Sequence, residues 1–122
     1  MKIWLSIASL NGALAVLMGA FAAHALGPSH PFASAFSTAA HYHLIHAAAM
    51  AIAALAMRGP AAPRARIAAM LFLAGTLLFS GSLYLLTLTG LHAFAFITPV
   101  GGLTLVAAWL ALAMAALKLE TQ

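Results

Sequence analysis

The stretch IWLSIASLNGALAVLMGAFAAHAL, residues 3–26, contains no Lys, Arg, Asp or Glu. A helix needs about 20 mostly apolar residues to cross the hydrocarbon core of a bilayer, and this run is longer than that. The stretch therefore predicts a transmembrane helix. Lys2 and the sequence AAHA at 22–25 also resemble a secretory signal peptide with an A-x-A cleavage site. The apolar run is longer than the usual core of a signal peptide, so we expect an uncleaved helix.

Three further apolar runs follow, over about residues 37–57, 67–88 and 99–117. Glycine-proline pairs at 27–28 and 59–60 are typical of helix ends, because proline cannot continue the helix after a glycine cap. Thr98 and Pro99 are typical of a helix start, with Thr98 as N-cap. Alternatively, the last helix begins near Ala93 and kinks at Pro99. The sequence thus predicts an all-α protein, an integral membrane four-helix bundle, as one transmembrane domain over residues 1–122.

The composition supports lipid as the solvent. Of the 122 residues, 66% are hydrophobic and 5% charged, and the mean hydropathy is +1.10. Such a chain cannot cover the surface of a water-soluble domain with polar groups. The net charge of +4 does not indicate nucleic-acid binding, because the basic residues are isolated along the chain. The absence of cysteine excludes disulfides, thiolate metal sites and cysteine nucleophiles.

The basic residues predict the orientation. With four crossings, all of them fall on the side of the two termini and the 57–67 loop, and the loops on the other side carry no Lys, Arg, Asp or Glu. The positive-inside rule then predicts a multi-pass protein of the bacterial inner membrane with both termini in the cytoplasm. The basic residues are Lys2, Arg58, Arg64, Arg66 and Lys118.

Histidine is the side chain most suited to chemistry inside the spans. The only carboxylate, Glu120, lies beyond the last span, which excludes paired-carboxylate hydrolysis, Ser-His-Asp triads and carboxylate proton relays within this chain. We therefore do not expect an enzyme acting alone. The segment AAHYHLIHAAAMA, 39–51, holds three of the six histidines. On a helix His43 and His46 lie about 60° apart and His41 about 140° from His46, so one face presents only the pair.

The polar side chains gather in the outer half of the predicted bundle. His46 and Ser80 both lie about 13 Å below the outer helix ends, at about 1.5 Å per residue. Two interpretations compete: interhelical hydrogen bonds that stabilise packing between small residues, or a functional site marked by a buried ionisable group. For His46 we weigh these evenly, whereas His41 is expected near the interface. The pocket that the second interpretation predicts is built from His24, His46, Ser80, Ser82, Tyr84 and Thr98.

Four motifs resemble one known family. GAFAAHAL at 19–26, YHLIH at 42–46, FSGSLY at 79–84 and ITPVGG at 97–102 resemble, in this order, the YgdD family of small bacterial inner-membrane proteins, which has relatives among eukaryotic transmembrane proteins. Ala22 and Ala108 stand where the family commonly has glycine, and His41 and His43 are not part of its pattern. The resemblance implies a four-helix membrane protein and supplies no activity. It adds Tyr42, Gly101 and Gly102 to the candidate ligand-binding residues.

Three classes of function follow from the sequence. The first is binding or transport of a small molecule or ion through the polar pocket, where transport by so small a bundle would need a homo-oligomer. The second is a haem or metal site, with His24 and His46 as axial ligands or with His43 and His46 in a Zn²⁺ or copper site. The third is a structural or assembly partner of another membrane protein. The sequence names no cofactor and no ligand.

Overall fold

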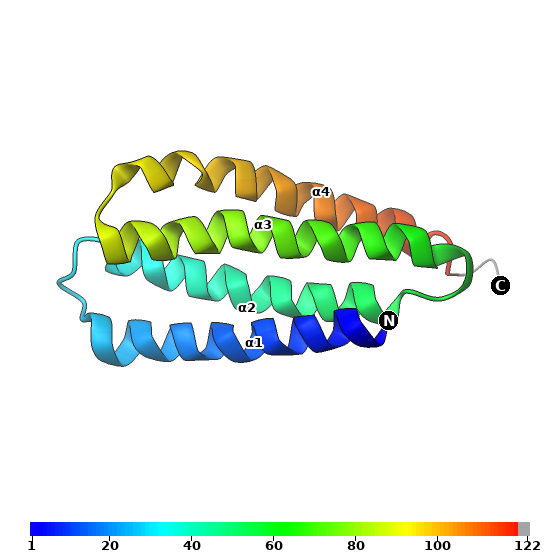
Figure 1. Ribbon diagram of the computed structural model, residues 1–122, viewed down its shortest axis with the longest axis horizontal. Coiled ribbons are helices and arrows are strands. Elements are labelled where there is room, and N and C mark those ends of the chain that lie inside the picture. The colour runs from blue at the N-terminus through cyan, green and yellow to red at the C-terminus, as the bar shows by residue number, and fades with distance from the viewer. Residues whose placement is uncertain (120–122) are drawn as a thin grey trace.

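The computed structural model describes residues 1–119. Glu120, the acidic residue of the sequence, lies outside the described residues. Within this range all regular structure is helical. Each predicted span overlaps one long helix (Figure 1). The helices are α1, Lys2–Phe21, extended by a π-helical turn, Ala22–Leu26; α2, Ala33–Leu55; α3, Ala62–Thr89; and α4, Thr98–Ala116. Short 3₁₀ segments, Gly59–Ala61 and His92–Phe96, precede α3 and α4.

Glycines and prolines set the helix ends. Gly27, Gly59 and Gly90 have positive φ angles of 78°, 47° and 71°, a backbone region in which a side chain is strained. Gly90 caps α3 through a hydrogen bond from its N–H to the Leu86 carbonyl. Gly59 lies in the connection after α2, which has already ended at Leu55.

All four helices begin before the predicted residue: α1 begins one residue earlier, and α2 begins at Ala33 instead of residue 37. α3 begins at Ala62 instead of residue 67, because Pro63 occupies the first turn, where proline needs no N–H partner. α4 begins at Thr98 and not after it, so Thr98 is not the N-cap; its hydroxyl bonds Ser82 on α3 instead. Pro99 lies in the first turn of α4, as expected, and residues 92–96 form a separate 3₁₀ segment.

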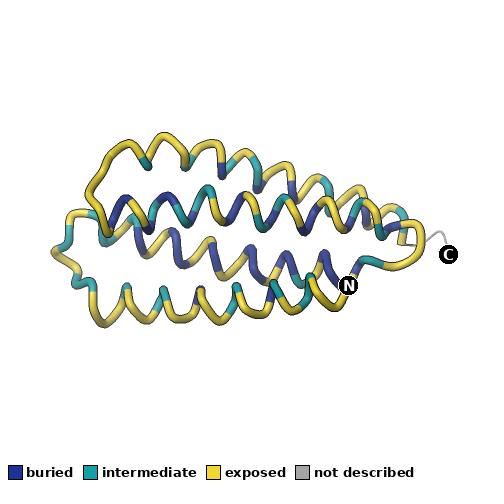
Figure 2. The backbone as a smooth tube through the Cα atoms, in the orientation of Figure 1, coloured by how far each residue is buried: buried dark blue, intermediate teal, exposed yellow. Residues whose placement is uncertain are grey.

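The helices pack side by side in chain order. α1 packs on α2, α2 on α3 and α3 on α4, whereas α1 and α4 share no substantial interface (Figure 1). Burial follows this arrangement, being greatest along α2 and α3 (Figure 2). The bundle is therefore open between α1 and α4, because each of these flanking helices packs mainly on one neighbouring helix.

Small residues allow the close packing in the centre. The main core cluster joins all four helices around Phe72 and Met50, which are both fully buried. Most of the other core positions are alanine, and small residues let helix backbones approach closely where lipid supplies no hydrophobic driving force. The members of this cluster are Ala8, Ala49, Met50, Ala53, Ala68, Ala69, Phe72, Leu105 and Ala108.

Three helical segments are long and apolar enough to cross a membrane: Lys2–Leu26, Gly59–Thr89 and His92–Ala116. α2 does not qualify by the same measure, since its histidines lower its hydropathy. It nevertheless runs alongside α1 and α3 for most of their length (Figure 1). Its crossing of the bilayer, like the cytoplasmic position of the termini, stays a prediction.

The two ends of the bundle differ in charge. The N-terminus, the α2–α3 connection and the end of α4 lie together (Figure 1). We call this the cationic end; it carries Lys2, Arg58, Arg64, Arg66 and Lys118. The opposite end, which we call the histidine end, carries His24, His30 and His92.

Candidate functional site

His43 links three helices near the middle of the bundle. Its Nδ1 lies 2.9 Å from the Tyr84 hydroxyl on α3, and its Nε2 lies 3.1 Å from Asn11 Oδ1 on α1. His43 is 3% exposed and Tyr84 8% exposed. The pair therefore satisfies polar groups that would otherwise be buried without partners.

The direction of this hydrogen-bond chain follows from its far end. The Asn11 amide nitrogen donates to the Ile7 carbonyl at 3.2 Å, which leaves Oδ1 facing His43. Because an amide oxygen only accepts, His43 carries its proton on Nε2 and donates it to Asn11. Nδ1 is then the acceptor for the Tyr84 O–H. The Ile7 carbonyl thus orients the Asn11 amide, and the amide oxygen in turn determines which nitrogen of His43 carries the proton.

The structure corrects one expectation from the sequence: His43 is buried between three helices and does not lie, with His41, near the interface. Helical spacing put His43 about 60° from His46 but gave no information about the neighbouring helices. Asn11 was missing from the candidate residues. The signal for it was its position as a lone amide side chain within an apolar span.

His46 has different partners. The Trp109 indole N–H on α4 donates to His46 Nε2 at 3.1 Å, and His46 Nδ1–H donates to the Tyr42 carbonyl at 2.7 Å. Indole is a donor only, so His46 carries its proton on Nδ1, the opposite tautomer to His43. The imidazole also packs against Phe72. Trp109, expected to be a packing residue, is thus a hydrogen-bond donor as well.

The structure does not bring the predicted metal or haem ligands together. His24 is exposed on the π-helical turn after α1 and has no hydrogen-bond partner among residues 1–119. His43 faces α1 and α3 whereas His46 faces α4, because 60° of rotation on α2 is enough to reach different neighbours. No group of three or more His, Asp or Glu in the described part of the chain could hold a metal ion.

The serine and threonine hydroxyl groups of the predicted pocket are hydrogen-bonded to other groups of the protein. Ser80 donates to the Ala39 carbonyl on α2 at 2.8 Å. Ser82 donates to the Phe79 carbonyl at 2.8 Å, which makes Thr98 the donor in the 2.6 Å contact between the Ser82 and Thr98 hydroxyls. Ser80, Ser82 and Thr98 therefore lie in two separate helix–helix contacts, α2–α3 and α3–α4, with their hydroxyl groups hydrogen-bonded within the protein.

The glycines at the start of α4 lie against α3. A Cβ atom built on Gly101 would lie 2.3 Å from the Phe79 backbone nitrogen. A Cβ on Gly102 would meet only the Phe79 ring, at 3.7 Å. Gly101 is therefore needed for the close approach of two backbones.

Thr76 differs from the hydrogen-bonded serine, threonine and histidine side chains described above. Its hydroxyl is buried, with the residue 4% exposed, and has no hydrogen-bond partner among the described residues. We expect Thr76→Val to raise the free energy of unfolding by about 1 kcal/mol, since valine keeps the shape and removes the unpaired group. Denaturation by SDS in mixed micelles measures this.

Thr87→Val is the matched control for this measurement. The Thr87 hydroxyl is similarly buried but donates to the Leu83 carbonyl at 2.9 Å. Its replacement is expected to leave stability unchanged or slightly lower. A Thr76→Val variant less stable than the native protein would show that the hydroxyl has a partner after all.

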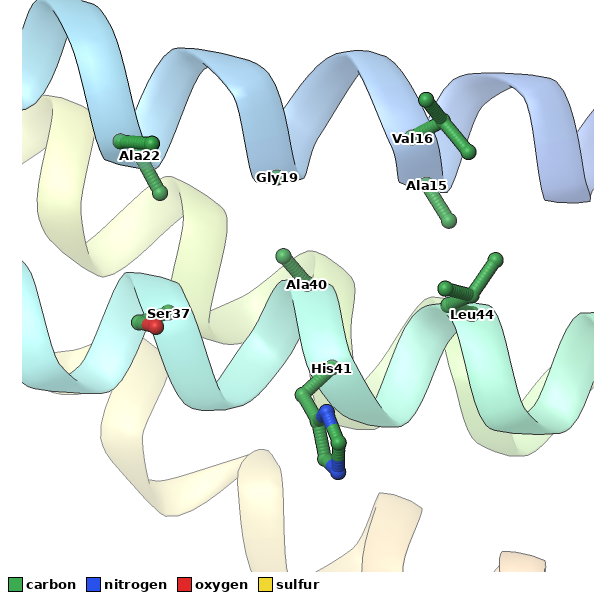
Figure 3. A pocket seen from close by; sticks show the side chains of 9 residues that line it. Ala15, Val16, Gly19, Ala22, Ser37, Ala40, His41 and Leu44 are labelled. Atoms are coloured by element: carbon green, nitrogen blue, oxygen red, sulfur yellow. The ribbon is translucent and has the colours of Figure 1, made fainter.

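A cleft between α1 and α2 is the largest opening near the histidine end. It has a volume of about 430 Å³. Ala15 and Ala22 extend from α1 toward α2, and Ala40 and Leu44 extend toward α1, whereas the His41 ring points away from α1 (Figure 3). Sequence reasoning noted the small residues of α1 but missed the cleft. It is lined by Ala15, Val16, Gly19, Ala22, Ala23, Ser37, Ala40, His41 and Leu44.

Comparison with known proteins places the chain among membrane proteins. The family model described as "Protein of unknown function (DUF423)" matches residues 18–102. The chain is 36% identical to the membrane protein YwdK of Bacillus subtilis, and the match covers 97% of the chain and 98% of YwdK. It is 33% identical to the inner membrane protein YgdD of Escherichia coli K12, over 98% of the chain and 92% of the relative. No solved structure matches.

Proposed function

The chain belongs to the DUF423 family. From the geometry of the α1–α2 cleft we propose that it binds a small amphipathic molecule there. It is a multi-pass protein of the bacterial inner membrane, as the sequence predicted. The family description gives no activity. The proposal therefore depends on the geometry of the cleft, whose open volume is the observation that carries it.

The volume and lining of the cleft suit a small ligand. Small-molecule sites are typically about 300–1,000 Å³, mostly apolar, with a few polar groups that fix orientation. The cleft falls within this range, at about 430 Å³. Its walls are alanine, glycine, valine and leucine, with Ser37 on α2 as a polar lining residue; His41 also lines the cleft, but its ring points away from α1 (Figure 3). An apolar body with one polar group matches this lining.

Binding is favoured over transport. Side chains of the predicted polar pocket are hydrogen-bonded within the bundle: Tyr84 pairs with His43, and Ser82 pairs with Thr98. A transported ion or polar molecule would have to replace these hydrogen bonds inside the bundle. Likewise, both His46 nitrogens already have protein partners, which leaves neither free as a haem or metal ligand.

Gly19 offers a direct test of the cleft. A Cβ atom built on Gly19 would meet no atom within 4 Å, and Gly19 lines the cleft, so a leucine at this position has open space in which to extend. We expect this variant to reduce labelling by a photoreactive palmitic acid analogue at least about fivefold, because leucine occupies the ligand's volume. Labelling of α1 and α2 peptides in membranes, quantified by mass spectrometry, is the measurement.

Gly81→Leu is the matched control. Gly81 on α3 also has no atom within 4 Å of a built Cβ and does not line the cleft. Its labelling should equal that of the native chain. Equal labelling of the Gly19 and Gly81 variants would exclude the cleft as the binding site.

A second candidate is assembly with another membrane protein or a second copy of this chain. It is favoured by the flanking positions of α1 and α4, which each pack mainly on one neighbouring helix and leave their remaining faces without a protein neighbour among the described residues. Chemical crosslinking in native membranes tests it. A crosslinked partner in fixed ratio that is retained in the Gly19→Leu variant would favour assembly over ligand binding.

A further inference from the structure

The cationic end has a charge that this part of the chain does not balance. All five Lys and Arg residues lie there, and residues 1–119 contain no Asp or Glu. Arg58 directs its Nε–H to the Leu55 carbonyl, a neutral partner, at 2.8 Å. Lys and Arg residues near a membrane surface are attracted to the headgroups of anionic lipids.

A small groove between α3 and α4 adjoins this charge. Arg64, Ile67, Ala111 and Met114 line it, and its volume is about 100 Å³. Arg64 lies in the first turn of α3, and Met114 lies in the last turn of α4. Ile67 and Met114 are 52% and 54% exposed, so the groove opens on the outer surface of the bundle. The lining of the groove is entirely apolar, so Arg64 contributes the hydrocarbon part of its side chain to the wall.

The start of α3 adds to the positive potential. Its first turn has no acidic residue and its N-cap, Ala61, provides no side-chain hydrogen bond. A helix N-terminus already carries a partial positive charge, and Arg64 and Arg66 increase it. An external anion beside Arg64 therefore reduces a repulsion that no acidic side chain among residues 1–119 relieves.

We propose that Arg64 and the α3–α4 groove bind an anionic phospholipid. The guanidinium group pairs with the headgroup phosphate, for which its planar donors are suited. One acyl chain lies along Ile67, Ala111 and Met114. Inorganic phosphate or an acidic peptide would satisfy the charge but not the apolar lining. A phospholipid satisfies both, which commits the site to lipid.

Charge-removing variants at neighbouring positions test the headgroup contact. Arg64→Gln is compared with Arg66→Gln, which removes the same charge from the same turn but from a side chain outside the groove. The full-length protein in detergent is titrated with dioleoylphosphatidylglycerol and followed by native mass spectrometry. We expect affinity to fall at least about fivefold for Arg64→Gln and less than twofold for Arg66→Gln. Equal losses in the two variants would overturn the site.

Two further arms separate lipid from other anions. Dioleoylphosphatidylcholine and inorganic phosphate should each bind at least about tenfold more weakly than the anionic lipid. Ala111→Leu fills the groove without changing charge and should also weaken binding about fivefold, whereas Ala107→Leu, on the exposed surface of α4, should not. Full binding by Ala111→Leu, or equal binding of both lipids, would overturn the proposal. If Ala111→Leu does not fold, the comparison of Arg64→Gln with Arg66→Gln tests the proposal.

Discussion

Gly101→Ala is expected to lower the free energy of unfolding by about 3 kcal/mol or more, the largest loss from any single methyl group in this protein. The new Cβ would lie 2.3 Å from the Phe79 nitrogen, 2.6 Å from the Leu78 carbonyl carbon and 2.7 Å from the Phe79 Cα. All three are backbone atoms of α3, so no side-chain rotation relieves the overlap. α4 must move away from α3.

Gly102→Ala tests whether this loss comes from close packing. The nearest atoms to its added Cβ belong to the Phe79 ring, at 3.7 Å and 3.9 Å, which is ordinary contact. Alanine also favours the helix by up to about 1 kcal/mol, so this variant should be as stable as the native chain or more stable. SDS denaturation in mixed micelles compares the two. Similar stabilities for both variants would contradict the close approach of α3 and α4.

His43→Ala is expected to cost about 3 kcal/mol of unfolding free energy. The substitution removes two interhelical hydrogen bonds, worth about 0.6 kcal/mol each in membrane proteins, and leaves a cavity in the packed centre. It also leaves the Tyr84 hydroxyl and the Asn11 amide oxygen without their partner. α1 should detach first, since it packs on α2 alone.

His41→Ala is the matched control, with the same change two residues away. The His41 side chain is exposed and has no hydrogen bond to the described residues, so its loss should change stability by less than about 0.5 kcal/mol. Tyr84→Phe separates hydrogen bonding from packing, because it keeps the ring that contacts Phe36 and removes only the donor. A His43→Ala variant as stable as His41→Ala would show that the chain through His43 does not hold α1.

The positions of the helices were predictable because their signals are local. The run over residues 3–26 is too long and too apolar for anything but a helix in lipid, and Gly27 ends it at the predicted residue. The start of α3 was misplaced because Arg64 and Arg66 were taken as loop residues, although Pro63 favours the first turn of a helix. Arg64 and Arg66 were used to predict where the membrane-spanning segment begins, but α3 itself begins earlier, at Ala62.

The candidate site was less predictable, because partners depend on neighbouring helices. The sequence singled out His46 and Tyr84 as members of one pocket, but His46 bonds Trp109 and Tyr84 bonds His43. Asn11 was overlooked although it completes the chain through His43. Serine, threonine and histidine carry the same hydrogen-bonding capacity whether they pair with a helix or with a ligand. Their residue types could not distinguish the two.

The sequence by itself determined the solvent of this protein, its helical class, the approximate extent of its helices and its family. These properties come from apolar runs, glycines and prolines that act within a few residues. Only the tertiary structure decided that α1 and α4 lie apart, that His43 and His46 face different helices, and that a cleft opens beside Gly19. The reason is that the rotation and depth of each helix are set by its contacts with the others, and a rotation of 60° is enough to exchange one partner for another.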